Sequence, residues 1–142
     1  MNDDYTFTSA AGFVIYKLSK NNQPLFLALK ALPEFQTKNH GLYDIPKGRI
    51  DPGETALQCA IREANEEACI DVTHLDSGPF VHDRLTVWLA ESYQVPFIRV
   101  NPTTGIREHL DYLWVKPEAM EANCLDYLKP HIQWARKYIG DL

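Results

Sequence analysis

The stretch that decides the fold, residues 48–67, reads GRIDPGETALQCAIREANEE. Gly48, Pro52 and Gly53 lie close together at its start, and this composition predicts that Lys47–Gly53 is a loop. Residues Glu54–Glu67 contain no glycine or proline and many residues that favour helices, so we expect a helix there. The chain therefore presents a tight loop that leads directly into an acidic helix.

The predicted helix has two chemically different faces. At about 100° per residue, the apolar residues form one packing face, which comprises Leu57, Ala60, Ile61, Ala64 and Ala68. Glu63, Glu66 and Glu67 fall on the opposite side at spacings i, i+3 and i+4, where like charges repel by about a few tenths of a kcal/mol. A divalent cation would offset this repulsion, although acidic faces are also common on solvated surface helices. Arg62 lies four residues before Glu66, and we expect a salt bridge between them.

The segments around this helix predict strands on both sides of it and a further helical region at the end. Before it we expect a buried strand and its hairpin partner joined by a turn, then a short extended piece: Ala10–Leu18, Ser19–Pro24 (turn), Leu25–Leu32 and Gly41–Ile45. After it we expect three strands and two helical segments: Phe80–His82, Leu85–Ser92 and Asp111–Val115, a helix beginning at Pro117, and helical spacing over Leu125–Ile139. Pro130 requires the last helix to start just before it. This order predicts an α+β sandwich in a single domain, residues 1–142.

Composition narrows the class of protein. The 142 residues carry a net charge of −5 and are 45% hydrophobic, which is enough for a core and argues weakly against a general nucleic-acid binder. Three dispersed cysteines, with no C-x-x-C pair, favour reduced thiols in a cytoplasmic protein over disulfides or structural zinc. The amino-terminal residues do not resemble a signal peptide, and no stretch reaches the roughly 20 apolar residues needed to cross a membrane.

The spacing of six residues resembles the Nudix box. That motif is glycine, five residues, glutamate, seven residues, Arg-Glu, an aliphatic residue, any residue, Glu-Glu, any residue, glycine and an aliphatic residue. The matching residues are Gly48, Glu54, Arg62, Glu63, Glu66 and Glu67, with Ala64 and Ile70 at the aliphatic positions. Cys69 replaces the glycine that ends the family's helix in a left-handed turn. If the left-handed turn is kept, cysteine lowers the stability by about 1 kcal/mol relative to glycine. The sequence therefore does not decide how the helix ends.

The resemblance implies an α/β/α sandwich with a mixed central sheet, in which the box forms a loop–helix–loop. It also implies Mg²⁺ or Mn²⁺ held by Glu63, Glu66, Glu67 and the backbone carbonyl of Lys47. Gly48 would let the backbone approach a ligand closely. Glu54 would orient the site or join the metal ligands, whereas from its position alone it could simply stabilise the helix start. The Lys47 side chain either reaches a phosphate or is an exposed loop lysine.

Segments outside the box resemble the diadenosine tetraphosphate hydrolases of this superfamily. These segments are residues 43–48 (YDIPKG), 85–91 (LTVWLAE) and 107–115 (REHLDYLWV). The last resembles a Glu-His-x-x-Tyr-x-Trp segment, which implies that Glu108 assists the metal site or accepts a proton from water. Tyr43 and Tyr112 are candidates to stack an adenine, and Arg84 to bind a phosphate. Each of these three residues also fits an ordinary core or surface role.

The resemblance implies a Nudix hydrolase with a small nucleotide as substrate, and a dinucleoside polyphosphate is the first expectation. Other Nudix substrates remain alternatives, because the box carries chemistry and not specificity: ADP-ribose, a (d)NTP, an inositol pyrophosphate, or a capped RNA end as the one nucleic-acid case. A non-catalytic nucleotide sensor is a further alternative. No membrane partner is expected, and the sequence leaves the oligomeric state open.

Overall fold

The computed structural model describes residues 8–31, 43–100, 105 and 109–140. Its strands are β1 (Ala10–Leu18), β2 (Pro24–Ala31), β3 (Tyr43–Asp44), β4 (Lys47–Arg49), β5 (Ser77–His82), β6 (Leu85–Glu91) and β7 (His109–Val115). The helices are α1 (Ala56–Ala68), α2 (Pro117–Asn123), a short 3₁₀ helix η3 (Asp126–Leu128) and α3 (Lys129–Gly140). Both the strand–helix–strand–helix order and the predicted start of the last helix just before Pro130 are confirmed.

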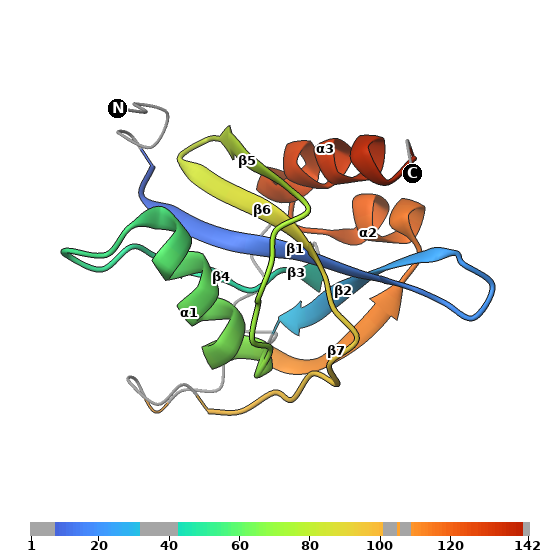
Figure 1. Ribbon diagram of the computed structural model, residues 1–142, viewed down its shortest axis with the longest axis horizontal. Coiled ribbons are helices and arrows are strands. Elements are labelled where there is room, and N and C mark those ends of the chain that lie inside the picture. Colours follow the sequence, from blue (N-terminus) through green and yellow to red (C-terminus); the bar gives the residue numbers. More distant parts are fainter. Residues whose placement is uncertain (1–7, 32–42, 101–104, 106–108, 141–142) are drawn as a thin grey trace.

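The described strands form one mixed sheet with helices on both of its faces (Figure 1). The central order is β3-β2-β1-β6-β5, with β4 also paired to β1 and β7 to β2. β1 and β6 are parallel, and the other pairs are antiparallel. The α/β/α sandwich expected from the resemblance is therefore present.

The side chains of strand β1 pack into two hydrophobic cores, one on each face of the sheet. They alternate between faces, as the two-residue period of a strand dictates. Val14 and Tyr16 pack into the cluster that includes α2 and α3, whereas Phe13 and Ile15 pack into the cluster that includes α1. Burial on both faces accounts for the nearly continuous apolar character of this strand.

Two local predictions around the box were wrong. Lys47–Arg49 is a strand and not a loop, because its backbone pairs antiparallel with Ala10–Gly12. The absence of a side chain at Gly12 permits this contact, since a Cβ there would lie 2.3 Å from the Pro46 carbonyl oxygen. Helix α1 also begins at Ala56 and not at Glu54. Thr55 is its N-cap, and its side chain and that of Gln58 form a reciprocal capping box.

The buried face of α1 is rotated relative to the predicted face. Ile61 is 38% exposed, so its assignment to the packing face was wrong. The face turned to the sheet instead includes Cys59, Glu63 and Glu67 beside the small residues Ala60 and Ala64. Glu63 turns inward because Gly48 leaves room for its carboxylate above β4. Two of the three acidic side chains are therefore buried.

Helix α1 ends at Cys69 in the left-handed conformation that glycine adopts in the family. Cys69 has φ 56° and ψ 35°, and its N–H donates to the carbonyl groups of Ala64 and Asn65. The Cys69 bond to Asn65 spans four residues, as in the αL type of helix ending, and the N–H of Ile70 also donates to the Ala64 carbonyl at 3.2 Å. The turn is thus kept despite the unfavourable residue, and the residues that follow retain their direction.

The segment with helical spacing, Leu125–Ile139, is divided between two elements. Its first turn is the 3₁₀ helix η3, and α3 follows from Lys129.

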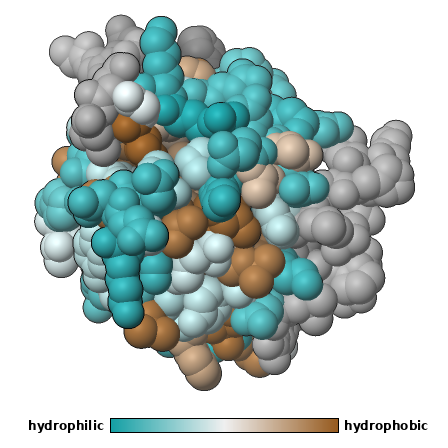
Figure 2. All heavy atoms as spheres, turned by 90° about the vertical axis from the view of Figure 1, so that its right-hand side faces the viewer, coloured by the Kyte–Doolittle hydropathy of each residue, from teal (hydrophilic) through white to brown (hydrophobic). Residues whose placement is uncertain are grey.

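The face of the molecule that carries the β1–β2 hairpin and the ends of α2 and α3 is largely hydrophilic, with apolar side chains gathered near its centre (Figure 2). No helix in the described part of the chain is long and apolar enough to cross a membrane.

Candidate active site

Arg62 organises the acidic side of α1. Its Nε and Nη2 donate to the two carboxylate oxygens of Glu54 at 2.8 and 3.0 Å. Its Nη1 donates to Glu63 at 3.0 Å and to Glu66 at 3.2 Å, which confirms the expected salt bridge to Glu66. Its Nη2 also donates to the Arg49 carbonyl oxygen at 3.1 Å. A planar guanidinium suits such divergent contacts, so Arg62 ties the loop before the helix to the glutamates on it.

Glu54 lies before the N-cap of α1 and contributes to this network. One of its carboxylate oxygens accepts the Asp51 N–H at 3.0 Å, while both oxygens accept from Arg62. These hydrogen bonds hold the pKa of Glu54 below its usual range, chiefly through Arg62. The contacts fit the predicted orienting role.

Glu63 lies directly against the backbone of Gly48. A Cβ built at Gly48 would lie 2.0 Å from Glu63 Oε2, so only glycine leaves space for this carboxylate. Cys59, one turn earlier on α1, has its Sγ at 3.4 Å from the carbonyl oxygens of both Gly48 and Arg49. Burial raises the pKa of the Cys59 thiol to about 12, so the thiol packs the strand and is not a nucleophile.

Glu67 is the most strongly perturbed acid of the site. It is 8% exposed, and burial raises its pKa well above the usual value, with further contributions from the adjacent carboxylates of Glu63 and Asp44. Its Oε1 accepts the backbone N–H of Lys47 at 3.4 Å. Burial likewise raises the pKa of Glu63. Glu63 and Glu67 are therefore neighbouring carboxylates that are both buried between α1 and the sheet.

Lys47 brings a second positive charge, besides that of Arg62, close to Glu67. Its Nζ lies 3.3 Å from Asp44 Oδ1 and 5.3 Å from the centre of the Tyr127 ring. Burial alone would lower the pKa of Lys47, but the attraction of Asp44 and Tyr127 outweighs burial and raises it. The lysine thus stays charged, and its side chain is only 19% exposed, which excludes the alternative of a freely solvated loop lysine.

A cavity of about 250 Å³ lies beside the Gly48 backbone. Lys47, Arg49 and Arg84 line it together with Tyr127. Arg84 reaches this place because Asp83 and Arg84 form the two-residue turn between β5 and β6, with φ values of 54° and 68° that suit a tight hairpin. Three cationic side chains and one aromatic ring therefore surround one opening next to the acidic helix.

The donor set of the site suits a hard divalent cation. Six carboxylates, namely Asp44, Asp51, Glu54, Glu63, Glu66 and Glu67, adjoin two cationic side chains, Lys47 and Arg62. Burial first, and then the neighbouring carboxylates of Glu63 and Asp44, raise the pKa of Glu67. Carboxylate oxygens are the ligands that Mg²⁺ and Mn²⁺ prefer. Within the described ranges, no three acidic, histidine or cysteine side chains converge on one point; Glu63 and Glu66 share Arg62 instead.

The other predicted site residues have different surroundings. Tyr43 and Tyr112 do not line the cavity beside Gly48. Tyr43 is half-buried against the core under α2 and α3, and Tyr112 against the core under α1. Their substrate roles remain predictions, as does that of Glu108, which lies outside the described residues. Sequence reasoning missed Asp44 and Tyr127, because neither stands in the box.

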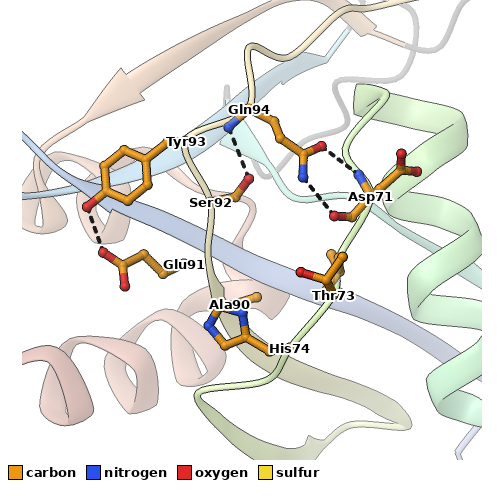
Figure 3. A pocket seen from close by; sticks show the side chains of 9 residues that line it. Asp71, Thr73, His74, Ala90, Glu91, Ser92, Tyr93 and Gln94 are labelled. Carbon is orange, nitrogen blue, oxygen red and sulfur yellow. Dashed lines mark hydrogen bonds between the residues drawn. The ribbon is translucent and has the colours of Figure 1, made fainter.

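A separate cavity of about 370 Å³ lies between the segment that follows α1 and the end of β6 (Figure 3). The Gln94 side chain there accepts the Asp71 N–H and donates to the Asp71 carbonyl oxygen, both at 2.8 Å. Tyr93 Oη donates to Glu91 at 2.6 Å. The two bonds between Gln94 and Asp71 join the two segments as strand pairing would, so we assign the cavity a structural role.

Comparisons with known proteins agree with the geometry. Residues 8–139 match the NUDIX domain family. The chain is 31% identical over 121 residues to the asymmetrical bis(5'-nucleosyl)-tetraphosphatase of Caenorhabditis elegans, an alignment that covers 77% of this chain and 79% of that protein.

Solved structures show the same fold. The crystal structure of a C. elegans Ap4A hydrolase binary complex has a TM-score of 0.70 at 24% identity, over 95% of this chain and 99% of that chain. RenU, a Nudix hydrolase from M. smegmatis, has a TM-score of 0.69 at 17% identity, over 95% and 87% of the two chains. The chain therefore belongs to the NUDIX domain family and is a Nudix hydrolase, an enzyme that acts on phosphoanhydride bonds.

Proposed function

We propose that this enzyme hydrolyses a dinucleoside polyphosphate, with diadenosine tetraphosphate as the expected substrate and Mg²⁺ or Mn²⁺ as the cofactor. The observation that carries the proposal is the arrangement on either side of Gly48. The buried carboxylates Glu63 and Glu67 lie on one side, and the cavity lined by Lys47, Arg84 and Tyr127 lies beside the same glycine. An acidic metal-binding face thus adjoins a cationic opening for a polyphosphate.

The cavity is lined by cationic side chains, so it suits an anionic polyphosphate better than a neutral ligand. Lys47, Arg49 and Arg84 offer ammonium and guanidinium donors, which form charge-assisted bonds with phosphate oxygens. Tyr127 is 40% exposed, so its ring is available to a base, and such stacking contributes about 1–3 kcal/mol. The C. elegans relative is named for a dinucleoside tetraphosphate substrate, which supports the same choice.

The proposed reaction is attack of water on a phosphorus of the polyphosphate chain. The new bond joins the water oxygen to phosphorus, the anhydride P–O bond breaks, and the departing phosphate group keeps the electron pair. Glu63, Glu66, Glu67 and the Lys47 carbonyl would hold the metal, which when bound lowers the pKa of water and balances phosphate charge. Glu63 or Glu108 would orient the water and accept its proton. A mononucleotide leaves, together with the remaining nucleotide polyphosphate.

A substrate panel tests the proposal. Diadenosine tetraphosphate, ADP-ribose, a dNTP, capped RNA and an inositol pyrophosphate are each incubated with Mg²⁺ or Mn²⁺, with chelator as the control, and the products are separated by chromatography. We expect the highest kcat/KM for diadenosine tetraphosphate, with AMP and ATP as products. A tenfold preference for another compound would replace the substrate assignment. No cleavage of any compound would favour a nucleotide sensor.

Arg84→Gln refines the test of the cavity. Arg84 lies in the β5–β6 turn and lines the cavity, whereas the exposed Arg99 contacts Asn65 in the carboxyl-terminal part of α1 and does not line that cavity. We expect Arg84→Gln to raise KM several-fold with kcat retained, and Arg99→Gln to leave KM unchanged. Equal KM values for Arg84→Gln and the wild type would argue against a phosphate site in this cavity.

A further inference from the structure

Asp44 lies at the centre of a small network beneath the proposed active site. It is 8% exposed on β3. Its Oδ1 accepts the Ile45 N–H at 2.8 Å and lies 3.3 Å from Lys47 Nζ. Its Oδ2 lies 3.4 Å from Lys47 Nζ and 3.2 Å from His109 Nε2. One buried carboxylate therefore joins β3, the start of β4 and the start of β7.

These partners occupy the Asp44 carboxylate, so Asp44 does not contact the substrate directly. Burial alone would raise the pKa of Asp44, but Lys47, His109 and the Ile45 N–H together lower it. Both carboxylate oxygens lie within 3.4 Å of the Lys47 ammonium. A buried ion pair needs its partners in fixed positions, which makes Asp44 a determinant of where Lys47 lies.

Lys47 has an alternative set of partners close by. Its backbone N–H already contacts Glu67 Oε1 at 3.4 Å, and the Glu67 carboxylate attracts the ammonium. A lysine side chain is flexible and its charge is compact. Without Asp44, the ammonium would be free to move onto the Glu63 and Glu67 carboxylates, where it would compete with a metal ion and leave the cavity.

We propose that Asp44 is a positioning residue, which holds the Lys47 ammonium at the mouth of the cationic cavity and away from Glu63 and Glu67. Its contact with His109 fixes the first residue of β7 to the same point, next to Glu108 in the sequence. The inference rests on the proposed function, because it assigns Lys47 to a substrate phosphate. It adds that the phosphate contact depends on a carboxylate outside the Nudix box.

A double-mutant cycle tests whether Asp44 acts through Lys47. Asp44→Asn keeps the shape and an acceptor for the Ile45 N–H but removes the charge, and Lys47→Met removes the ammonium. For diadenosine tetraphosphate with Mg²⁺, we expect each variant to raise KM about tenfold, with kcat within about threefold of the wild type. Because both changes remove the same contact, the double variant should differ from Lys47→Met by less than about twofold.

Asp76→Asn is the matched control. Asp76 is also part-buried, accepts the Glu91 N–H at 2.7 Å and lies 3.5 Å from a histidine, His74, but it has no contact with Lys47 in the described structure. It should leave KM unchanged. KM values for the double variant that equal the product of the two single effects, about 100-fold, would overturn the proposal, as would an unchanged KM in Asp44→Asn.

Two further measurements distinguish failure of this inference from failure of the proposed function. Binding of inorganic tripolyphosphate in the presence of Mg²⁺ is measured by calorimetry for the wild type, Asp44→Asn, Lys47→Met and the double variant. The cycle can then be evaluated even if diadenosine tetraphosphate is not cleaved. Asp44→Ala with added formate provides a second variant. Formate should restore its affinity, because it supplies a carboxylate in the vacated space, but should not restore that of Lys47→Met. Failure of formate to restore a folded Asp44→Ala, as judged by circular dichroism, would count against the positioning role.

Discussion

Replacing Cys69 with glycine should stabilise the protein. Cys69 ends α1 with φ 56° and ψ 35°, a conformation that costs a residue with a Cβ about 1–2 kcal/mol. Glycine adopts this conformation freely, but its greater freedom in the unfolded chain reduces the gain in stability by about 0.4–1 kcal/mol. No described hydrogen bond uses the Cys69 thiol, so little else is lost. The expected net gain is about 0.5–1 kcal/mol.

Urea denaturation at equilibrium measures this gain. For a chain of this length, about 1 kcal/mol corresponds to a rise of about 3 °C in Tm. Cys69→Ala is the control, since it removes the thiol and keeps the Cβ, and it should lie within about 0.3 kcal/mol of the wild type. Cys69→Asn should lie between the two, because asparagine tolerates the left-handed region better than most residues.

The result that refutes this reasoning is equal stability of Cys69→Gly and Cys69→Ala. It would mean that the left-handed backbone at Cys69 carries no measurable penalty, or that the αL helix ending relaxes in solution. A loss of stability in Cys69→Gly would show that the thiol packs more favourably than its half-exposed position indicates. Hydrogen exchange of the Ile70 N–H, which donates to Ala64, distinguishes a relaxed turn from an intact one.

Three more predictions concern the site and its support. Glu67→Gln should abolish hydrolysis yet raise Tm in metal-free buffer, because it removes a charge whose burial already raises the pKa of Glu67; near-normal turnover would sink the assignment. Gly48→Ala should lower kcat at least about tenfold and raise the metal requirement, since its Cβ would meet Glu63; unchanged metal titrations would contradict this. Burial lowers the pKa of His131, so below about pH 6.5 the unfolded chain takes up the proton first and stability falls, by at most about 1.4 kcal/mol per pH unit. His131→Phe should flatten that slope below about pH 6.5 in urea titrations, and an unchanged slope would exclude His131 as its source.

The sequence predicted those parts of the fold that local chemistry decides. The β1–β2 hairpin follows from apolar runs around Asn21 and Asn22, and the start of α3 follows from Pro130. The salt bridge between Arg62 and Glu66 follows from helical spacing alone. In each case the residues that determine the structure are close together in the chain.

Features that depend on distant partners were missed. Lys47–Arg49 becomes a strand only because β1 pairs with it, and Ile61 is exposed because the space over Gly48 turns Glu63 inward. Asp44 gains its importance from Lys47 and His109, and His109 lies 65 residues away in the chain. No periodicity or motif in a single sequence records such contacts.

The parallel pairing of β1 with β6 has a consequence for how the enzyme is made. Ala10 lies opposite Leu85, so the sheet closes across a separation of 75 residues (85 − 10) that includes the whole catalytic helix. Closure over that distance is entropically unfavourable and slow compared with hairpin formation. During synthesis, β1 and β4 are already available to α1 before β6 leaves the ribosome, and they are the strands on which α1 mainly packs. In a nascent chain Glu63 thus meets Gly48 early, whereas the edge of β1 that β6 occupies stays open until that strand has been made.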